Sequence, residues 1–474
     1  MTYTWDKAGN LATATATNGG GTTTYTYDTR EVVTSATAPG GTVIRFATDP
    51  TGRRTDTWFN TNATNTTWAA HSHTDFDAAG QLTGVWTARN SSDTIRVSDL
   101  TYNYAYDTDG GICTSATLTA GKQTAMRWVQ HDKITGVYTN YCYDSSNRLV
   151  TADPGNAGPT TYTYDVNGNI TQVASGATVL QSATVNAADQ ITSGGYAYDA
   201  SGNTTNRGGT GLLSYNGAEQ MTRVQSPDGS YTENLTYAGT DQTELLTLTD
   251  NYTSQANVYG RTDSNGLPLL ESFSYGTSDY YYIYDPAGTA LAFHGGAGYN
   301  DYLAPDGLGS TIALINSLGA QTAGYTYDPY GATTHTGPDD QLLQFTGGAH
   351  DLTGILTHFD TRWYDAATGR FTQPDSFEPL ADPTRANRYT YANNNPINYV
   401  DLTGLFSIVS VVKAAVVGAG AGLVGGLISG CIAGALATAG PGCGPGALVA
   451  GIAGAAGGAA TGALASVGNQ TIPG

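Results

Sequence analysis

The chain has 474 residues, enough for two or three domains, and only 12% of them are charged. Acidic residues outnumber basic ones by 39 to 19, and the net charge is −20. This balance excludes the cationic surface that nucleic-acid binding needs and disfavours contact with an anionic membrane surface. The 32 tyrosines and 62 glycines, together with abundant threonine, indicate a mainly β protein with many short strands and tight turns.

The N-terminal residues 1–20 contain no basic stretch followed by an apolar core, so they do not form a Sec-type signal peptide. The pattern described next already begins at Tyr3. We therefore expect either export by a non-Sec route or a longer parent chain whose further repeats complete the structure. An incomplete sheet would leave an open strand edge that pairs readily with another chain.

A repeat with the pattern Tyr-x-Tyr-Asp-x-x-Gly-Asn runs through residues 1–345. Clear copies begin at Tyr3, Tyr25, Tyr104, Tyr141, Tyr162, Tyr196, Tyr282 and Tyr325, and weaker copies begin at Ala47 and Thr74. The repeat aspartates Asp6, Asp28 and Asp49 follow one another at intervals of 22 and 21 residues. Each copy is long enough for two or three short strands.

The physics of one copy predicts a hairpin. Alternation along a strand places both tyrosine rings on the same face. The aspartate then ends the strand by accepting hydrogen bonds from its own turn, and Gly-Asn tolerates positive φ. Stacked hairpins bury a face that one hairpin cannot, which predicts a long spiralling antiparallel sheet over residues 1–345 with a tyrosine ladder. Aromatic rows also suit stacking on sugar rings, so carbohydrate binding is an alternative role.

Inside the repeats, alternate residues carry side chains that bind metals: His71, His73, Asp75 and Asp77. On a strand they share one face, which suits a metal ion. Exposed polar alternation explains the same pattern, and Asp77 is already a repeat aspartate. We therefore expect neither a metal nor another cofactor.

Four cysteines permit three pairings and form no metal motif: Cys113, Cys142, Cys431 and Cys443. Cys113 and Cys142 suit a cross-strand disulfide, with free, partly buried thiols as the alternative. The redox compartment stays open.

Residues 346–405 contain fewer copies of the repeat and more motifs of specific sequence. In chain order these are Thr353-Gly354-Ile355, Thr361–Asp365, Thr368–Phe371, Pro374-Asp375, Tyr389-Thr390-Tyr391, Asn394-Asn395-Pro396 and Asp401–Leu405. Their order and spacing resemble the core segment of RHS-repeat (YD-repeat) proteins of the polymorphic-toxin type, and the upstream repeats fit the same family.

The resemblance implies a β-shell that cuts its own chain after the final Gly-Leu, here between Leu405 and Phe406. It also implies an aspartyl-protease-like site made from Asp375, Asp401 and Arg362. The chemistry suits these residue types, because two close carboxylates can share a proton and serve as base and acid. A guanidinium holds one carboxylate ionised or polarises the carbonyl.

One residue departs from the family pattern. Leu402 stands where the family has proline, so the backbone near the predicted bond is less constrained. The alternative role of the two aspartates is to cap turns, as the repeat aspartates do.

Residues 406–474 differ in composition, with Lys413 as their only charged residue. The segments Ala414–Ala439 and Ala447–Val467 are each long enough to span a bilayer, and a Pro-Gly-rich break separates them. Glycines recur every four residues on one helical face: Gly418, Gly422, Gly426, Gly430, Gly434, Gly454, Gly458 and Gly462. This spacing lets helices pack closely in lipid, which predicts an α-helical apolar hairpin. Two apolar helices inside a protein cavity give the same pattern.

These predictions describe a secreted or cell-surface carrier with a repeat shell (1–345), a self-cleaving core segment (346–405) and a membrane-active effector (406–474) used in competition between bacteria. The expected partners are a target-cell membrane, an immunity protein and a further RHS segment that completes the shell. The alternative is an adhesion protein whose repeats bind carbohydrate or a partner cell, with the tail as membrane anchor. An inactive fragment of either is the third interpretation.

Overall fold

The chain is built almost entirely from antiparallel strands. The computed structural model describes residues 1–16, 20–108, 113, 118–240, 242–263, 266–295, 300–375, 387–405 and 408–409. Within each sheet of the described residues, consecutive strands pair with one another, so each sheet is a run of hairpins. This confirms the predicted mainly β, antiparallel fold.

The first sheet has 15 strands. They are β1 (Thr2–Trp5), β2 (Leu11–Ala16), β3 (Gly21–Tyr27), β4 (Val33–Thr37), β5 (Val43–Thr48), β6 (Arg54–Phe59), β7 (Ala70–Phe76), β8 (Leu82–Arg89), β9 (Arg96–Asn103), β10 (Val129–Asp132), β11 (Val137–Tyr143), β12 (Leu149–Asp153), β13 (Thr160–Tyr164), β14 (Ile170–Ser175) and β15 (Thr178–Ser182).

The second sheet has 14 strands. They are β16 (Ala197–Tyr198), β17 (Thr204–Asn206), β18 (Leu212–Tyr215), β19 (Met221–Gln225), β20 (Thr232–Tyr237), β21 (Leu245–Thr249), β22 (Ser254–Thr262), β23 (Pro268–Tyr275), β24 (Ser278–Tyr284), β25 (Ala290–His294), β26 (Asn300–Pro305), β27 (Thr311–Asn316), β28 (Gln321–Tyr327) and β29 (Thr333–Thr336).

The core segment adds two small sheets. Its strands are β30 (Ala349–His350), β31 (Leu356–Phe359), β32 (Arg362–Asp365) and β33 (Arg370–Phe371), and the pair β34 (Tyr399–Val400) and β35 (Ile408–Val409). Among the described residues, helical structure is limited to the single 3₁₀ turns η1 (Pro39–Gly41), η3 (Phe345–Gly347) and η6 (Ala392–Asn394).

The repeat aspartates shape the hairpin turns as expected. In eight copies the Oδ1 atom accepts hydrogen bonds from the backbone amides two and four residues later: Asp6, Asp28, Asp49, Asp144, Asp165, Asp199, Asp306 and Asp328. The residue three after the aspartate has positive φ, and it is usually glycine, as at Gly52 with φ +88°. The Asp-x-x-Gly pattern is therefore a built turn that fixes the register of each hairpin.

The tyrosine directly before the aspartate ties each hairpin to the chain before it. In five copies its hydroxyl donates to a backbone carbonyl 14–16 residues upstream: Tyr27 to Leu11, Tyr143 to Arg127, Tyr164 to Leu149, Tyr284 to Leu270 and Tyr327 to Thr311. Many of the repeat tyrosines are buried; Tyr25 is 8% exposed and Tyr162 is 5% exposed. Rings packed inside the wall are not accessible to sugars, so the ladder does not support the carbohydrate alternative.

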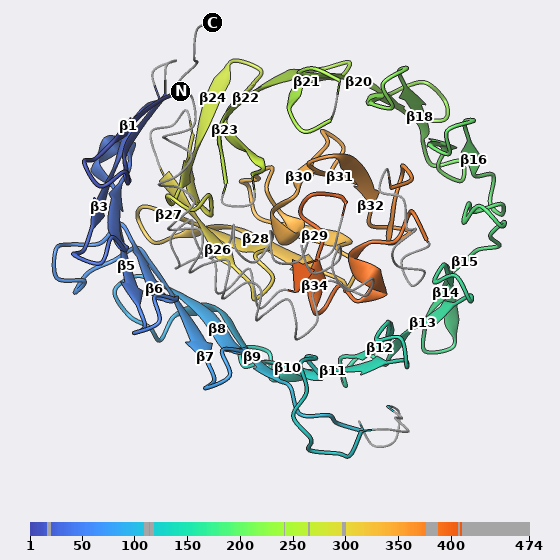
Figure 1. Ribbon diagram of the computed structural model, residues 1–474, viewed down its shortest axis with the longest axis horizontal. Coiled ribbons are helices and arrows are strands. Elements are labelled where there is room, and N and C mark those ends of the chain that lie inside the picture. The colour runs from blue at the N-terminus through green and yellow to red at the C-terminus, as the bar shows by residue number, and fades with distance from the viewer. Residues whose placement is uncertain are drawn as a thin grey trace, which may run out of the picture.

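The two sheets follow one another around a ring and then turn inward (Figure 1). Strands β1–β15 and the first strands of the second sheet make the outer wall, and the last strands of the second sheet, among them β26–β29, pass inside this wall. Bonds between the layers agree with this view, since the Tyr302 hydroxyl donates to Ser72 Oγ at 2.8 Å and Arg54 pairs with Asp285 at 2.8 Å. The largest apolar cluster lies between these layers and draws its residues from β2–β7 and β23–β28.

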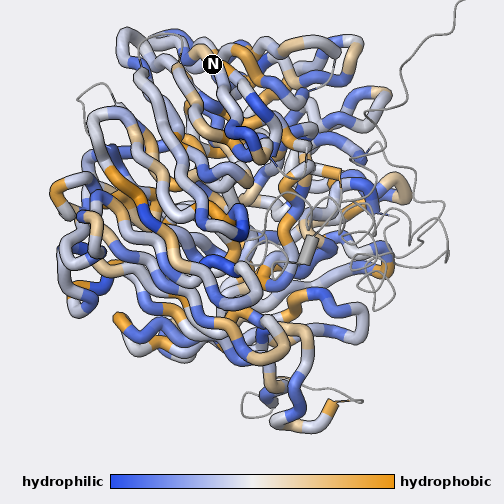
Figure 2. The backbone as a smooth tube through the Cα atoms, turned by 60° about the vertical axis from the view of Figure 1, so that its left-hand side comes forward, coloured by the Kyte–Doolittle hydropathy of each residue, from blue (hydrophilic) through white to orange (hydrophobic). Residues whose placement is uncertain are grey.

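Polar and apolar residues alternate along many wall strands (Figure 2). Strand β22, for example, alternates exposed and buried positions over most of its length. Alternation of this kind is typical of a sheet with one face toward the interior and one toward solvent.

The predicted single sheet is interrupted between β15 and β16. Residues 183–196 form a short hairpin in which one isolated bridge joins Val185 to Ile191. Its turn keeps the repeat geometry, because Asn186 Oδ1 accepts from the amides of Ala188 and Gln190. The arms are too short for a continuous ladder, so the wall consists of two open sheets where one was expected.

The core segment lies inside the ring of strands (Figure 1). Asn394 Nδ2 donates to the Gly168 carbonyl and the Tyr389 hydroxyl donates to the Gly202 carbonyl, both at 2.7 Å. Within the segment, aromatic side chains form their own buried cluster: Phe345, Phe359, Tyr364, Phe371 and Tyr391. The core segment is thus held by its own packing and by the turns of the surrounding wall.

The structure describes the first cysteine pair but not the C-terminal glycine zipper. Cys113 and Cys142 form a disulfide between the segment after β9 and strand β11, which decides between the two alternatives for this pair. Phe406 and the zipper glycines from Gly418 to Gly462 lie outside the described residues, so the helical hairpin stays a prediction. Among the residues that the structure describes, no helix is long and apolar enough to cross a membrane.

Candidate active site

Arg362 brings together the residues that the sequence singled out. It is the first residue of β32, and its Nη2 atom lies 3.1 Å from Asp375 Oδ2 and 3.7 Å from Asp401 Oδ2. Its Nη1 donates to the carbonyl oxygen of Arg388 at 3.0 Å, and its Nε donates to the carbonyl oxygen of Gly404. The two predicted catalytic carboxylates therefore converge on one guanidinium nitrogen.

This cluster is largely shielded from solvent. The side chains of Arg362 and Asp401 are 4% and 2% exposed, and that of Asp375 is 18% exposed. Burial lowers the pKa of Arg362, while the carboxylates of Asp375 and Asp401 oppose this shift. Two carboxylates held by one guanidinium can divide the roles of acid and base between them, which is the arrangement that acid–base hydrolysis uses.

The segment Asp401–Leu405 forms the same kind of turn as the repeats. Asp401 Oδ1 accepts the amide of Leu405 at 3.1 Å, and Gly404 has φ +67°. A Cβ at Gly404 would lie 2.6 Å from a backbone carbonyl of β31, so only glycine fits this close approach. Asp401 therefore caps a turn with one oxygen and faces Arg362 with the other, and its two predicted roles are compatible.

Arg362 anchors the chain one peptide before the predicted bond. It binds the carbonyl of Gly404, while the bond predicted to break follows the carbonyl of Leu405. The amide of Leu405 is held by Asp401 in turn. The arrangement fixes the residues that precede the Leu405–Phe406 bond, and it places Arg362 as an anchor of that segment.

A cavity of about 360 Å³ adjoins this cluster. The core segment lines it with Arg362, Gln373, Pro374, Arg388 and Leu405, and the wall lines it with Ser201, Asn203, Ala218, Glu219 and Gln242. A water molecule has a share of about 30 Å³ in the liquid, so a space of this size admits the water that hydrolysis consumes.

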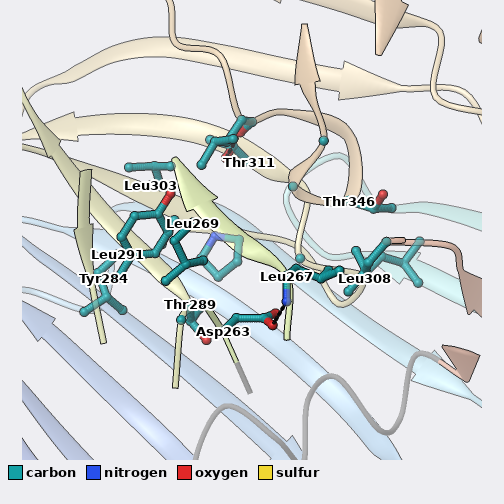
Figure 3. A pocket seen from close by; sticks show the side chains of 18 of the residues that line it. Asp263, Leu267, Leu269, Tyr284, Thr289, Leu291, Leu303, Leu308, Thr311 and Thr346 are labelled. Atoms are coloured by element: carbon teal, nitrogen blue, oxygen red, sulfur yellow. Dashed lines mark hydrogen bonds between the residues drawn. The ribbon is translucent and has the colours of Figure 1, made fainter. Parts of the chain in front are cut away.

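A second cavity, of about 310 Å³, lies between the inner strands, the wall and the core segment. Its lining is mainly apolar and includes Leu269, Leu291 and Leu303, and Asp263 accepts the Leu267 amide at 2.9 Å beside it (Figure 3). Leu402 also lines this cavity. The residue that replaces the family proline therefore contributes to apolar packing inside the shell.

The histidines of β7 are hydrogen-bonded to neighbouring aspartates. His71 Nε2 and His73 Nδ1 lie 3.0 Å and 2.6 Å from Asp56 Oδ1. The hydrogen bond to Asp56 raises the pKa of His73. Asp77 Oδ1 accepts the amide of Gln81 at 2.8 Å, so it serves its own turn. The described part of the chain contains no group of three or more histidine, cysteine or acidic side chains able to hold a metal ion.

With the fold and site in place, the family can be decided. The model of the Teneurin YD-shell family matches residues 128–397, more than half of the chain. The chain belongs to the Teneurin YD-shell family. It is thus an RHS/YD-repeat shell protein, as the sequence resemblance implied.

YD-shell relatives come from animals and bacteria. Teneurin-3 of Danio rerio is 29% identical over 307 residues, and Teneurin-4 of Homo sapiens is 26% identical over 288 residues. These matches cover 63% and 57% of this chain and 10% of each teneurin. The tRNA3(Ser)-specific nuclease WapA of Bacillus spizizenii is 27% identical over 282 residues, which are 55% of this chain and 12% of that protein. The chain thus spans about a tenth of the length of these relatives.

Solved YD-shell-like structures share the fold. A TcdB2–TccC3 crystal structure matches with a TM-score of 0.58 at 18% identity, and the match covers 81% of this chain and 22% of that chain. The Photorhabdus luminescens Tc holotoxin pore matches with a TM-score of 0.57 at 18% identity, over 82% of this chain and 22% of that chain.

Motif analysis missed the wall residues beside the site. Gln242, Glu219 and Tyr237 contact the core segment but belong to ordinary-looking repeats, more than 100 residues upstream. One signal was present in the sequence: Asp351–Ile355 repeats the Asp-Leu-Thr-Gly of Asp401–Leu405 and thereby indicates that the predicted cleavage segment is a repeat turn.

Proposed function

We propose that this chain is a shell-type carrier that cuts itself between Leu405 and Phe406 and releases residues 406–474. The observation that carries this proposal is the convergence of Asp375 and Asp401 on Arg362 beside Leu405. Membership of the YD-shell family supports the carrier, and a toxin-type nuclease among the relatives supports delivery of a C-terminal effector.

In the proposed reaction, one carboxylate of the Asp375–Asp401 pair takes a proton from water, and the water oxygen attacks the carbonyl carbon of Leu405. The other carboxyl carries the shared proton and gives it to the nitrogen of Phe406 as the C–N bond breaks. The products are a carboxylic acid at Leu405 and a free amine at Phe406. Positioned acids and bases each contribute about 100- to 10,000-fold.

Residues 406–474 are the proposed effector. Their composition suits insertion into a target-cell membrane, because glycines at every fourth position allow close helix packing. A producing cell then needs an immunity protein, and the open sheets leave edges for a further RHS segment. The proposed location is outside the cell or on its surface, reached by a non-Sec route.

The teneurin matches favour a second candidate, an interaction module on a cell surface with the tail as its anchor. The buried tyrosine ladder leaves the outer wall as the surface for a partner cell.

The intact mass of the purified chain tests the first proposal against the second. Wild type should give a fragment that ends at Leu405, while Asp375→Asn and Asp401→Asn should remain full length, since each removes one half of the acid–base pair. A fragment that ends at Gly404 would move the reaction to the peptide that Arg362 anchors. One uncut chain in all three samples would reject self-cleavage and leave the interaction module.

Asp351→Asn is the matched control, because it alters the same turn sequence away from Arg362. It should be cut like wild type. Loss of cutting in this control as well would show that the turns only support folding.

A further inference from the structure

The wall holds the strand that carries Arg362 on both sides. The residue before it, Thr361, accepts a hydrogen bond through its carbonyl from Gln242 Nε2 at 3.0 Å. The residue after it, Trp363, donates from Nε1 to the Tyr237 hydroxyl at 2.9 Å. Gln242 and Tyr237 belong to the wall hairpin β20–β21, so one hairpin brackets the guanidinium of the site.

The strand that leads to Asp375 is held by the neighbouring hairpin. Gln373 Nε2 donates to the carbonyl of Glu219 at 2.8 Å, and Gln373 Oε1 accepts the amide of Trp363 at 3.2 Å. Glu219 has φ +62° in the turn between β18 and β19, and its carboxylate accepts from Ser201 Oγ at 2.8 Å. A wall turn therefore contacts the segment two residues before Asp375.

The wall contact continues to the predicted bond. Gln242 Oε1 accepts the amide of Met221 at 3.0 Å, which fixes the orientation of its amide group. Its donor side holds Thr361, and Thr361 holds the carbonyl of Thr403 through its amide at 3.2 Å and its hydroxyl at 2.7 Å. Thr403 lies two residues before Leu405. Gln242 is only 6% exposed, so these bonds lie in a largely buried part of the site, where a hydrogen bond is stronger than in water.

We propose that Gln242 is a positioning residue for self-cleavage, assisted by Tyr237 and Glu219. The inference rests on the proposed function, and it adds that the site is complete only after the wall has folded around the core segment. Folding of the wall thereby becomes the condition for the cut. A core segment that acted earlier would free residues 406–474 before a shell surrounded them, and dependence on the wall prevents this.

Refolding of the full chain from urea, with the cut fraction followed over time, tests the proposal. Gln242→Glu keeps the oxygen that accepts from Met221 and removes the donor to the Thr361 carbonyl, together with a longer bond to the Glu219 carbonyl at 3.4 Å. The rate should fall about 10- to 100-fold, because small misplacements of reacting groups cost this much. The pH profile should be compared in Tyr237→Phe, which adds no charge to the cavity and should keep the wild-type shape, since Asp375 and Asp401 are unchanged.

Asn257→Ala is the matched control. Asn257 is 7% exposed, so it is about as buried as Gln242. Its side chain donates to the carbonyl of Leu245 within the wall at 2.8 Å. It should lower the urea midpoint without slowing the cut. Tyr237→Phe, which removes one hydroxyl and keeps the ring, should fold like wild type and cut several-fold more slowly. Equal rates for Gln242→Glu, Tyr237→Phe and wild type would overturn the inference, as would equal slowing by Asn257→Ala.

Hydrogen exchange gives a readout that does not require cutting. In the uncut Asp375→Asn chain, Gln242→Glu should speed exchange of the Thr361 and Leu405 amides, while amides of β22 stay protected. Unchanged protection would overturn the positioning role. If wild type is never cut, the proposed function fails and faster exchange still supports the structural link. If wild type is cut and Gln242→Glu matches it, only the further inference fails.

Discussion

The core segment contains one five-residue turn twice, in two different surroundings. Asp351–Ile355 and Asp401–Leu405 share Asp-Leu-Thr-Gly, and in each the aspartate Oδ1 accepts the amide four residues later, at 2.9 Å and 3.1 Å. Gly354 and Gly404 both have φ +67°. The local sequence thus determines the backbone of both turns, which is the backbone of the wall repeats as well.

The neighbours of the two aspartates differ. Asp351 lies beside the buried Glu233, whose Oε1 accepts the amide of Leu352 at 3.3 Å, whereas Asp401 lies beside Arg362. Burial and the charge of Asp351 raise the pKa of Glu233 to about 8, and burial raises the pKa of Asp351. The first turn is therefore joined to the wall through a protonated carboxyl group, that of Glu233, whereas the aspartate of the second turn faces a guanidinium. The two turns share one backbone, and the side chains that tertiary structure places beside them determine how their aspartates differ.

Removal of the Arg362 guanidinium, which distinguishes the second turn from the first, should have the largest effect on stability and on the cut. Arg362→Ala leaves Asp375 and Asp401 buried without their counter-ion, and loss of one partner of a buried pair costs about 3–5 kcal/mol. The free energy of unfolding in urea should fall by this amount and the cut should be lost. Arg30→Ala is the control, because Arg30 is 57% exposed and pairs with Asp28 at the surface. It should leave stability unchanged, and a similar loss in both variants would contradict the special status of Arg362.

The two glycines give the next largest difference. Gly354→Ala has open space around its Cβ, so it should cost only about 1 kcal/mol for the left-handed backbone. Gly404→Ala adds a clash with the carbonyl of Phe359 at 2.6 Å, and overpacking costs about 1–3 kcal/mol more. Thermal unfolding and intact mass of the two variants check this, with Gly404→Ala expected to stay uncut. Equal stability and equal cutting would show that the second turn has no tighter fit than the first.

Much of this contrast was predictable from the sequence, and part was not. The repeat pattern predicted hairpins, Asp turns and a tyrosine ladder on one face because these follow from neighbours within about 20 residues. The clustering of Arg362, Asp375 and Asp401 followed from the family resemblance. Gln242 and Glu233 carry no motif, and only the folding of the wall around the core segment brings them into contact with it. The sequence did not predict the break between the two sheets at residues 183–196, because the turn there keeps the repeat geometry and only the strands beside it are short.

The protonated contact of the first turn predicts a pH dependence of stability. Glu233 titrates near its ordinary 4.5 when unfolded and at about 8 when folded. Its contribution to stability is therefore fully present below 4.5 and is lost as the pH rises toward 8. Glu233→Gln cannot ionise, so the free energy of unfolding of this variant should fall less steeply over that range. Parallel pH dependence in wild type and variant would show that the carboxyl is solvated in the folded chain.

The smallest change in stability is expected for a substitution in the wall, away from both core turns. Tyr27→Phe removes the hydroxyl that donates to the Leu11 carbonyl at 2.8 Å, and a neutral hydrogen bond contributes about 1 kcal/mol. Tyr138→Phe, on a ring that is 55% exposed, is the control and should change nothing measurable. Because the same bond recurs in several copies, the wall distributes its stability over many equivalent contacts. Tyr27→Phe should therefore lower the urea midpoint slightly and leave the rate of the cut at the wild-type value. A slower cut in this variant, whose substitution lies far from the site, would instead mean that the rate of the cut depends on the stability of the whole wall.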